Sequence, residues 1–392
     1  MKAIVCEKVL SGHEVVENQV VIFDQHILSI ESKSAFESRP SEFIEKVEVH
    51  RYSGVLVPGF IDVHIHGASG HDVMDGTGEA IQKMSESIVK MGTTAFLATT
   101  MTMAQDRIER ALNTVRNHQT HQAEQLKMGQ KSGAKLIGAH LEGPFINPIF
   151  KGAQNLTYIQ KPTRQWLDPH MDVIKMITLA PEMDEGFAFI RSMKDTGVVL
   201  SMGHTGCDYE TACEAYEAGV HHVTHCFNAM TGLHHREPGV IGAILSKPFS
   251  LDIIADGIHV HPSFIGPFIK LKGIDKTVLI TDAMRAAMMP PGNYDLGGQK
   301  VIVDDKRCCL EDGTLAGSIL RLDQAIRNLL KHSDLTFVEV VRMLTENPAK
   351  LLGLFHERGS IAEGKVADFV LLNDDYQVSK VYVEGILNNL EA

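Results

Sequence analysis

The alternation of strand-like and helix-like segments over residues 58–353 constrains the fold of this chain most strongly. Short segments rich in apolar and β-branched residues alternate there with longer stretches that have the apolar spacing of amphipathic helices. The expected strands are Phe60–His66, Thr94–Thr99, Leu136–Glu142, Lys175–Leu179, Val198–His204, His222–His225, Leu251–Ala255 and Thr277–Asp282. Eight such repeats predict an α/β fold, a (β/α)8 TIM-like barrel. The competing topology is a doubly wound sheet of about nine or ten strands.

The stretches between these strands have the apolar spacing of helices. The expected helices are Thr77–Met91, Asp106–His118, Gly186–Thr196, Asp208–Ala218, Pro262–Lys272, Leu320–Lys331 and Thr336–Asn347. We expect Pro348 to end the last of them, because proline disrupts a helix interior.

Short strand-like runs without a helical period occur at both ends of the chain. They lie at Lys2–Val5, Val15–Phe23, Ile27–Ile30 and Glu45–His50, and again within 359–372 and 380–385. Because similar strands flank a different middle, we expect the two ends to pair. The predicted organisation is a small discontinuous β-sandwich domain, residues 1–57 with 354–392, and a barrel over 58–353.

Composition excludes several classes of partner. The net charge of −12, with no basic stripe, argues against binding to nucleic acid or to an anionic membrane. The amino terminus lacks the apolar stretch of a secretory signal, and no apolar run approaches the ~20 residues of a membrane helix. The six cysteines show no C-x-x-C spacing. We therefore expect a cytoplasmic protein with free thiols.

Potential metal ligands or acid/base groups stand at the ends of five of the eight expected strands. These are His64 and His66 on the first strand, Glu142 on the third, His204 on the fifth, His225 on the sixth and Asp282 on the eighth. His64 and His66 face the same way, because side chains alternate along a strand. The carboxyl ends of barrel strands meet at one face, so these groups predict a metal site there.

The ligand types indicate which metals can bind. Glu142, His204 and His225 can hold one ion and leave a coordination position open for water, as catalysis requires. His64 and His66 can complete a second site, with Glu142 bridging the two. Carboxylate and imidazole without thiolate suit Zn²⁺, Fe²⁺, Mn²⁺ or Co²⁺. We expect one or two divalent transition-metal ions per subunit, with zinc as the first candidate.

Several motifs, in order along nearly the whole chain, resemble the N-acetylglucosamine-6-phosphate deacetylases of the amidohydrolase superfamily. The motifs are Pro58–Gly67, His140–Phe145, Gly203–Thr205, Thr224–Met230, Arg236–Gly239, Asp256–His259, Thr281–Ala283, Gly313–Ser318 and the Gly-x-Ile-x-x-Gly-x-x-Ala-Asp tail. The first and last motifs are general to the superfamily. The His-Leu-Glu-Gly-Pro, Phe-Asn-Ala-Met and Arg-Glu-Pro-Gly elements are specific to the deacetylases.

The resemblance implies roles for individual residues. Glu142, His204 and His225 correspond to the principal metal ligands, and Asp282 to the catalytic acid/base. Positions where the family contacts substrate are Ala153, Gln154, Asn228, Ala229, Arg236, His259, Leu315, Ala316 and Gly317. The implied reaction is hydrolysis of N-acetyl-D-glucosamine 6-phosphate to D-glucosamine 6-phosphate and acetate, with Asp282 moving a proton from the attacking water to the amine.

The resemblance leaves the number of metal ions open. Some members of the family lack the first-strand histidine pair and use one ion, whereas this chain keeps His64 and His66. Gln154 stands where some single-metal members have a histidine.

The polar segment Thr231–Gly239 is punctuated by Gly and Pro and is therefore expected to be a loop. It is either an ordinary solvated loop or a phosphate clamp, because Arg236 suits bidentate contact with phosphate. In the family the corresponding Arg reaches the neighbouring subunit's site, which implies a homodimer. Either His234 or His235 can assist it.

Three rival functions and two open roles remain. A dihydroorotase-like enzyme needs a bridging lysine at the end of the fourth strand, but Lys175 begins that strand. A deaminase does not account for the Arg236 loop, and a non-catalytic scaffold is expected to lose metal ligands that this chain keeps.

Asp62 is either a support for the ligands or a strand-end hydrogen bonder. The segment 284–291 is either a lid or an apolar loop.

Overall fold

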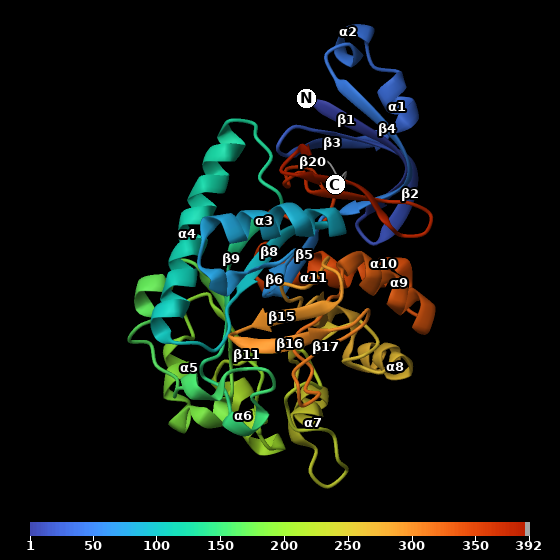
Figure 1. The fold of residues 1–392 in the computed structure, drawn as a ribbon. Helices are drawn as coiled ribbons and strands as arrows, with labels where there is room; N and C mark the ends of the chain where they lie inside the picture. The colour runs from blue at the N-terminus through green and yellow to red at the C-terminus, as the bar shows by residue number, and fades with distance from the viewer. Residues whose placement is uncertain (389–392) are drawn as a thin grey trace.

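An eight-stranded parallel sheet forms the centre of the computed structural model, which describes residues 1–388 (Figure 1). Its strands are β5 (Phe60–Ile65), β8 (Thr93–Thr99), β9 (Lys135–Glu142), β10 (Ile174–Leu179), β11 (Val199–Met202), β12 (His222–Val223), β13 (Ser250–Ile254) and β14 (Thr277–Ile280). Each strand pairs with the next in chain order. All eight predicted strands are present.

The sheet closes between its first and last strands. The backbone N–H of Asp282 donates to the carbonyl of His64 at 2.9 Å, and the N–H of His66 donates to the carbonyl of Ala283 at 2.9 Å. This closure confirms the predicted (β/α)8 barrel, because a doubly wound sheet would leave both edge strands unpaired. It also brings the ends of β5 and β14 side by side.

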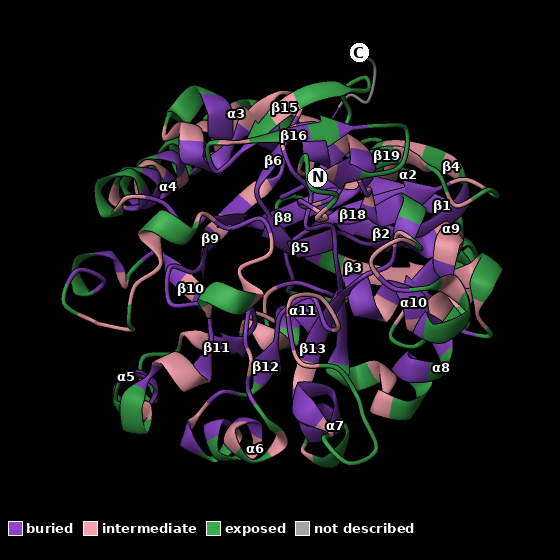
Figure 2. Cartoon of the chain, turned by 60° about the horizontal axis from the view of Figure 1, so that its bottom comes forward, coloured by how far each residue is buried: buried purple, intermediate pink, exposed green. Residues whose placement is uncertain are grey.

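Helices surround the barrel, and Figure 2 shows their outer faces exposed and the strands buried. They are α3 (Gly78–Ile88), α4 (Gln105–Lys127), α5 (Ala188–Ser192), α6 (Tyr209–Ala218), α7 (Gly239–Ser246), α8 (Pro262–Lys272), α9 (Leu322–His332), α10 (Phe337–Leu344) and α11 (Glu346–Leu351). Every predicted helix has a counterpart, and α4 runs nine residues beyond the predicted end at His118. The sequence analysis did not anticipate α7.

The prediction that Pro348 ends the helix beginning near Thr336 is wrong. The helix α10 ends at Leu344, and Pro348 lies in the first turn of α11. Proline is tolerated there because the N–H groups of a first turn have no partner within the helix. The break is at Thr345, whose φ of −129° and ψ of −72° are not helical.

Both ends of the chain contribute to one seven-stranded sheet, at the top of Figure 1. Its strands are β1 (Lys2–Ser11), β2 (Glu14–Phe23), β3 (Ile27–Ser32), β4 (Glu48–Pro58), β18 (Phe369–Leu372), β19 (Val378–Val383) and β20 (Ile386–Asn388), with the short helices α1 (Lys33–Glu37) and α2 (Ser41–Ile44) beside them. Strand β4 joins the two ends, parallel to β1 and antiparallel to β18. The predicted pairing of the termini is confirmed. The domain limits at 57/58 and 353/354 stay a prediction.

A three-stranded antiparallel sheet follows β14 and was not anticipated. It consists of β15 (Gly292–Leu296), β16 (Gln299–Val303) and β17 (Cys308–Cys309). Gly297 and Gly298, with φ of 58° and 81°, form the turn between β15 and β16. Alternating apolar residues on both sides of a Gly-Gly pair are a hairpin signal, so this sheet was predictable from the sequence. A second small hairpin pairs β6 (Gly67–Ala68) with β7 (His71–Asp72).

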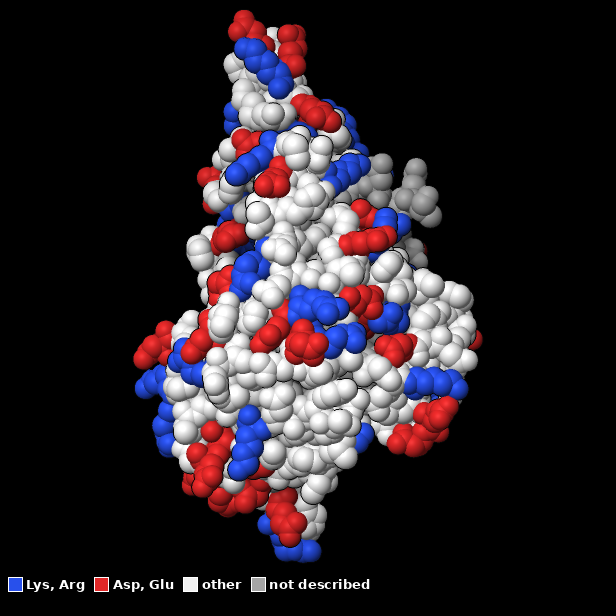
Figure 3. All heavy atoms as spheres, turned by 60° about the vertical axis from the view of Figure 1, so that its left-hand side comes forward, with Lys and Arg blue, Asp and Glu red and all other residues white. Residues whose placement is uncertain are grey.

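Among the described residues, no helix combines the length and the apolar character needed to span a membrane. On the face shown in Figure 3, Lys and Arg side chains are interspersed with Asp and Glu. This face therefore has no continuous basic stripe of the kind that binds nucleic acid.

Candidate active site

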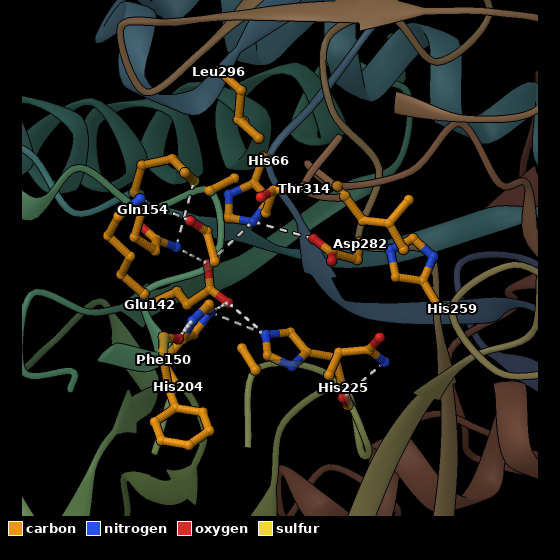
Figure 4. A pocket seen from close by; sticks show the side chains of 18 of the residues that line it. His66, Glu142, Phe150, Gln154, His204, His225, His259, Asp282, Leu296 and Thr314 are labelled. Atoms are coloured by element: carbon orange, nitrogen blue, oxygen red, sulfur yellow. Dashed lines mark hydrogen bonds and ion pairs between the residues drawn. The ribbon is translucent and has the colours of Figure 1, made fainter. Parts of the chain in front are cut away.

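A cavity of about 540 Å³ opens at the carboxyl ends of the barrel strands. Its lining includes His66, Glu142, His204, His225 and Asp282, which converge from separate strands (Figure 4). Residues that are far apart in the sequence therefore meet, because the ends of parallel strands share one face of a barrel.

The first group of potential ligands consists of Glu142, His204 and His225, all buried. Oε1 of Glu142 lies 3.2 Å from Nε2 of His204 and 3.1 Å from Nε2 of His225. The two imidazole Nε2 atoms are 3.2 Å apart. One carboxylate oxygen and two imidazole nitrogens thus converge on a single point.

The second group consists of His64, His66 and Asp282, also buried. Oδ1 of Asp282 lies 3.5 Å from Nε2 of His64 and 3.3 Å from Nε2 of His66, and these two nitrogens are 3.3 Å apart. Glu142 connects the two groups, because its Oε2 lies 3.3 Å from Nε2 of His66. A carboxylate between two ligand groups is positioned to bridge two ions.

Backbone carbonyls orient two of the histidines. Nδ1 of His66 donates to the Thr99 carbonyl at 3.2 Å, and Nδ1 of His204 donates to the Phe150 carbonyl at 2.9 Å. Because a carbonyl only accepts, each Nδ1 carries a proton, and Nε2 is the ring atom that can bind a metal ion in place of its own proton.

Three of the converging residues have a left-handed backbone. The φ angles are 48° at His204, 29° at His225 and 49° at Asp282. Such angles are unfavourable for non-glycine residues and cluster at functional sites. They also explain why β11, β12 and β14 each end two residues before the predicted strand end.

The charges of the two groups are strongly coupled. Burial alone would raise the pKa of Glu142 and Asp282, but the surrounding imidazoles outweigh it and hold both pKa values below their usual range. Burial would lower the pKa of His66 and His225, but the carboxylates raise these pKa values to about 10 and about 9. The site therefore requires positive charge, supplied either by protons or by cations.

The donor set fits divalent metal ions. Ligands ~2.0–2.1 Å from one tetrahedral ion are separated by ~3.3 Å, as the paired Nε2 atoms are. Nδ1 of His64 and Nδ1 of His225 have no hydrogen-bond partner among the described residues, whereas Nε2 of both rings faces the ligand groups. Binding of cations would replace the protons on the imidazoles. Both groups can therefore hold a metal ion.

Gln154 supports Glu142. Its Nε2 donates to Oε2 of Glu142, while its Oε1 accepts from the backbone N–H of Thr102 at 2.7 Å. The amide is thus fixed, and it in turn fixes the carboxylate between the two ligand groups.

Asp62 and His140 lie beneath the site. Asp62 accepts from the His64 backbone N–H at 3.2 Å and from the Thr281 hydroxyl at 2.6 Å, so it joins the first and last strands below the ligands. Burial raises the pKa of Asp62 to about 7. His140 contacts the Val63 carbonyl at 3.2 Å and the Thr178 hydroxyl at 2.7 Å, both within the barrel.

Most of the predicted substrate contacts lie on the cavity wall. Those lining it are Ala153, Gln154, Asn228, Ala229, His259, Leu315 and Gly317. Ala316 is fully buried behind the wall. Arg236 is exposed on its loop, and the cavity lining does not include it. One chain alone therefore does not bring Arg236 or Ala316 to the cavity.

Several lining residues were missed by the sequence analysis. Among the described residues that line this cavity, Lys151 is the only Lys or Arg. Leu296, Asp312 and Thr314 come from the β15–β17 sheet and the loop after it. Lys151 lies three residues before Gln154, and a lysine this close to a predicted contact was the available signal.

Within the segment 284–291, residues 284–287 pack against the barrel and residues 288–291 are exposed. Its residues Met284, Ala286 and Ala287 are fully buried, and no residue of 284–291 is among those lining the cavity. The side chain of Arg285 donates to Asp75 at 2.9 Å, which ties the segment to the barrel. These contacts favour the apolar loop over the lid.

Comparisons with known proteins place this chain in a family. The amidohydrolase family pattern matches residues 55–387. The chain is 39% identical to the N-acetylglucosamine-6-phosphate deacetylase of Bacillus subtilis over 383 residues, which cover 96% of this chain and 94% of the relative. It is 35% identical to an N-acetylgalactosamine-6-phosphate deacetylase of Escherichia coli O157:H7, over 86% of this chain and 88% of the relative.

A solved structure agrees in fold. The crystal structure of the N-acetylglucosamine-6-phosphate deacetylase from Pasteurella multocida superposes with a TM-score of 0.89 at 28% identity, over 98% of this chain and 99% of that one. The resemblance inferred from the sequence motifs is confirmed. The chain therefore belongs to the amidohydrolase family and, within it, to the family of the N-acetylglucosamine-6-phosphate deacetylases.

Proposed function

We propose that this chain hydrolyses N-acetyl-D-glucosamine 6-phosphate to D-glucosamine 6-phosphate and acetate, a reaction of amino-sugar catabolism and recycling. The observation that carries the proposal is the pair of ligand groups that share Glu142 on the wall of a 540 Å³ cavity, a volume suited to a sugar phosphate. The names of its relatives support the choice of substrate.

The two groups assign metal ligands. Glu142, His204 and His225 would hold one ion, and His64 and His66 would hold a second together with Asp282 or Glu142. Zinc is the first candidate, and iron, manganese and cobalt suit the same donors. When bound, such ions activate a water molecule and polarise the amide carbonyl.

Asp282 moves the proton. Its Oδ1 contacts His64 and His66, whereas its Oδ2 makes no hydrogen bond to another described residue and faces the cavity (Figure 4). Oδ2 takes the proton of the attacking water and delivers it to the departing nitrogen. The amine leaves poorly unless it is protonated, so one carboxylate serves both steps.

The phosphate end of the substrate requires cations, and Lys151 is the one Lys or Arg among the described residues that line the cavity. We expect Lys151→Ala to raise KM for the phosphorylated sugar ~10- to 100-fold, because a charge-assisted hydrogen bond contributes ~1.5–3 kcal/mol. Initial rates with N-acetylglucosamine, which lacks the phosphate, provide the control and should change little. An equal effect on both sugars would contradict this role.

The chain forms a homodimer in the cytoplasm. In this dimer Arg236 completes the phosphate-binding site of the neighbouring subunit. It lies exposed with Leu233, His234 and His235 on the loop before α7, at the end of the molecule opposite the terminal sheet (Figure 1). Its guanidinium contacts Nε2 of His235 at 2.7 Å.

A mixing experiment tests this arrangement. We expect Arg236→Ala homodimers to have a raised KM and Asp282→Asn homodimers to be inactive. A mixed dimer contains one site with an intact Asp282 and an Arg236 from the other chain, so exchanging subunits should restore about a quarter of wild-type activity. Mixtures no more active than their components would remove Arg236 from the neighbouring site.

The function itself is tested by acetate release from a matched set of sugars. N-Acetylglucosamine 6-phosphate should be hydrolysed with a higher kcat/KM than its C4 epimer N-acetylgalactosamine 6-phosphate, and with a much higher one than N-acetylglucosamine. A preference for the epimer would instead match the relative from Escherichia coli. No acetate from any of the three, despite bound metal, would refute the proposed function.

A further inference from the structure

Glu182 accepts hydrogen bonds from two loops that meet beside the first ligand group. It follows β10, a barrel strand that supplies none of the residues of the two ligand groups. Its Oε1 accepts from the Asn147 side chain at 2.8 Å and from the Gly206 backbone N–H. Its Oε2 accepts from the Thr205 hydroxyl at 2.6 Å and from the Cys207 thiol at 3.0 Å. A single carboxylate thus has four donors.

The first of these loops directly follows His204. Thr205, Gly206 and Cys207 are the next three residues along the chain, and all of them bond to Glu182. The backbone of His204 has a φ of 48°, which is strained for a histidine and requires support from its surroundings. Glu182 holds the chain immediately after this strained residue.

The second loop orients the imidazole of His204. Nδ1 of His204 donates to the Phe150 carbonyl at 2.9 Å. The backbone N–H of Phe150 in turn donates to the Asn147 carbonyl at 3.0 Å. The backbone carbonyl of Asn147 thus accepts from Phe150, and the side-chain amide of Asn147 donates to Glu182. The acceptor that sets the tautomer of His204 is therefore fixed through the same carboxylate.

The two loops pack closely enough to need this shared acceptor. A Cβ on Gly206 would lie 2.8 Å from the Phe150 ring and 3.0 Å from Nδ2 of Asn147. Burial and the neighbouring carboxylate raise the pKa of the Cys207 thiol, so this group stays protonated and donates. All four donors require a full carboxylate, because an amide offers only one accepting atom.

We infer that Glu182 is a positioning residue that aims Nε2 of His204 at the ion shared with Glu142 and His225. This inference rests on the metal sites of the proposed function. Glu182 acts by holding the backbone after His204 and by fixing the tautomer of the His204 imidazole. Loss of such partners of metal-binding histidines typically changes metal affinity ~10- to 100-fold. It does not contact His64 or His66, so the second ion should be unaffected.

The test is metal binding to Glu182→Gln, with Glu185→Gln as the matched control in the same segment. Glu185 is exposed and makes no side-chain hydrogen bond to another described residue. Metal-free wild type and variants are titrated with Co²⁺ against a chromophoric chelator, and the visible absorption of the bound Co²⁺ reports the geometry of each site. We expect Glu182→Gln to weaken one of the two ions ~10- to 100-fold and Glu185→Gln to weaken neither.

A second pair of variants covers the case in which Glu182→Gln does not fold. Cys207→Ser keeps a donor to Glu182 and should bind both ions as wild type does, whereas Cys207→Ala removes the donor and should weaken one ion. Wild-type affinity for both ions in Glu182→Gln, or in Cys207→Ala, would overturn the positioning role. An equal fall in the melting temperature of metal-free and metal-loaded Glu182→Gln would show a role in folding alone. A wild type that binds no ion would refute the proposed function as well.

Discussion

Asp282→Asn is expected to lower kcat for deacetylation by ~10²- to 10⁴-fold, with little change in KM. The amide has the shape of the carboxylate and can occupy the same place against His64 and His66. It cannot accept the proton of the attacking water, so the step that makes the amine a leaving group fails. Steady-state kinetics with N-acetylglucosamine 6-phosphate measure the loss directly.

Asp312→Asn is the matched control, because it removes another carboxylate from the lining of the same cavity. Asp312 is exposed and lies apart from both ligand groups, so its loss should change kcat by less than ~2-fold. Metal content measured on both variants separates a lost proton transfer from a lost ion. A kcat for Asp282→Asn within tenfold of wild type, with metal bound, would remove the acid/base role.

Removing the metal ions with a chelator is expected to abolish turnover and to lower the melting temperature. Without cations the buried carboxylates of Glu142 and Asp282 are balanced only by protons on the imidazoles, which cannot activate water as a metal does. Ligands that bind only the native state also stabilise it, so the thermal transition should fall when they are removed. Adding Zn²⁺, Mn²⁺, Fe²⁺ or Co²⁺ back should restore activity.

Two variants determine how the ions are shared. His66→Asn should reduce the metal content from about two ions per chain to about one, because it affects only the second group. Glu142→Gln should weaken both, since its oxygens face both groups. Full turnover by chelated protein that contains no measurable metal would refute the metal-dependent reaction, and one ion in the wild type would limit the site to Glu142, His204 and His225.

Much of the fold followed from the sequence because its signals are local. The apolar periodicity that distinguishes a strand from a helix lies within single segments, and all eight barrel strands were recognised from it. The i, i+2 spacing of His64 and His66 is also a local signal, because side chains alternate along a strand and both imidazoles therefore lie on the same face of it. The Pro348 prediction failed because a local rule about helix interiors was applied to a first turn.

The candidate site depended on contacts between distant segments. The sequence by itself determined which residue types stand at the strand ends, since barrel geometry takes every strand end to one face. Only the tertiary structure decided that Glu142 lies between two ligand groups, that Gln154 and Glu182 hold the ligands in place, and that the sheet after β14 lines the cavity. These relations depend on loop paths and left-handed backbone angles at His204 and Asp282, which are set by packing between elements and leave no periodic trace in the sequence.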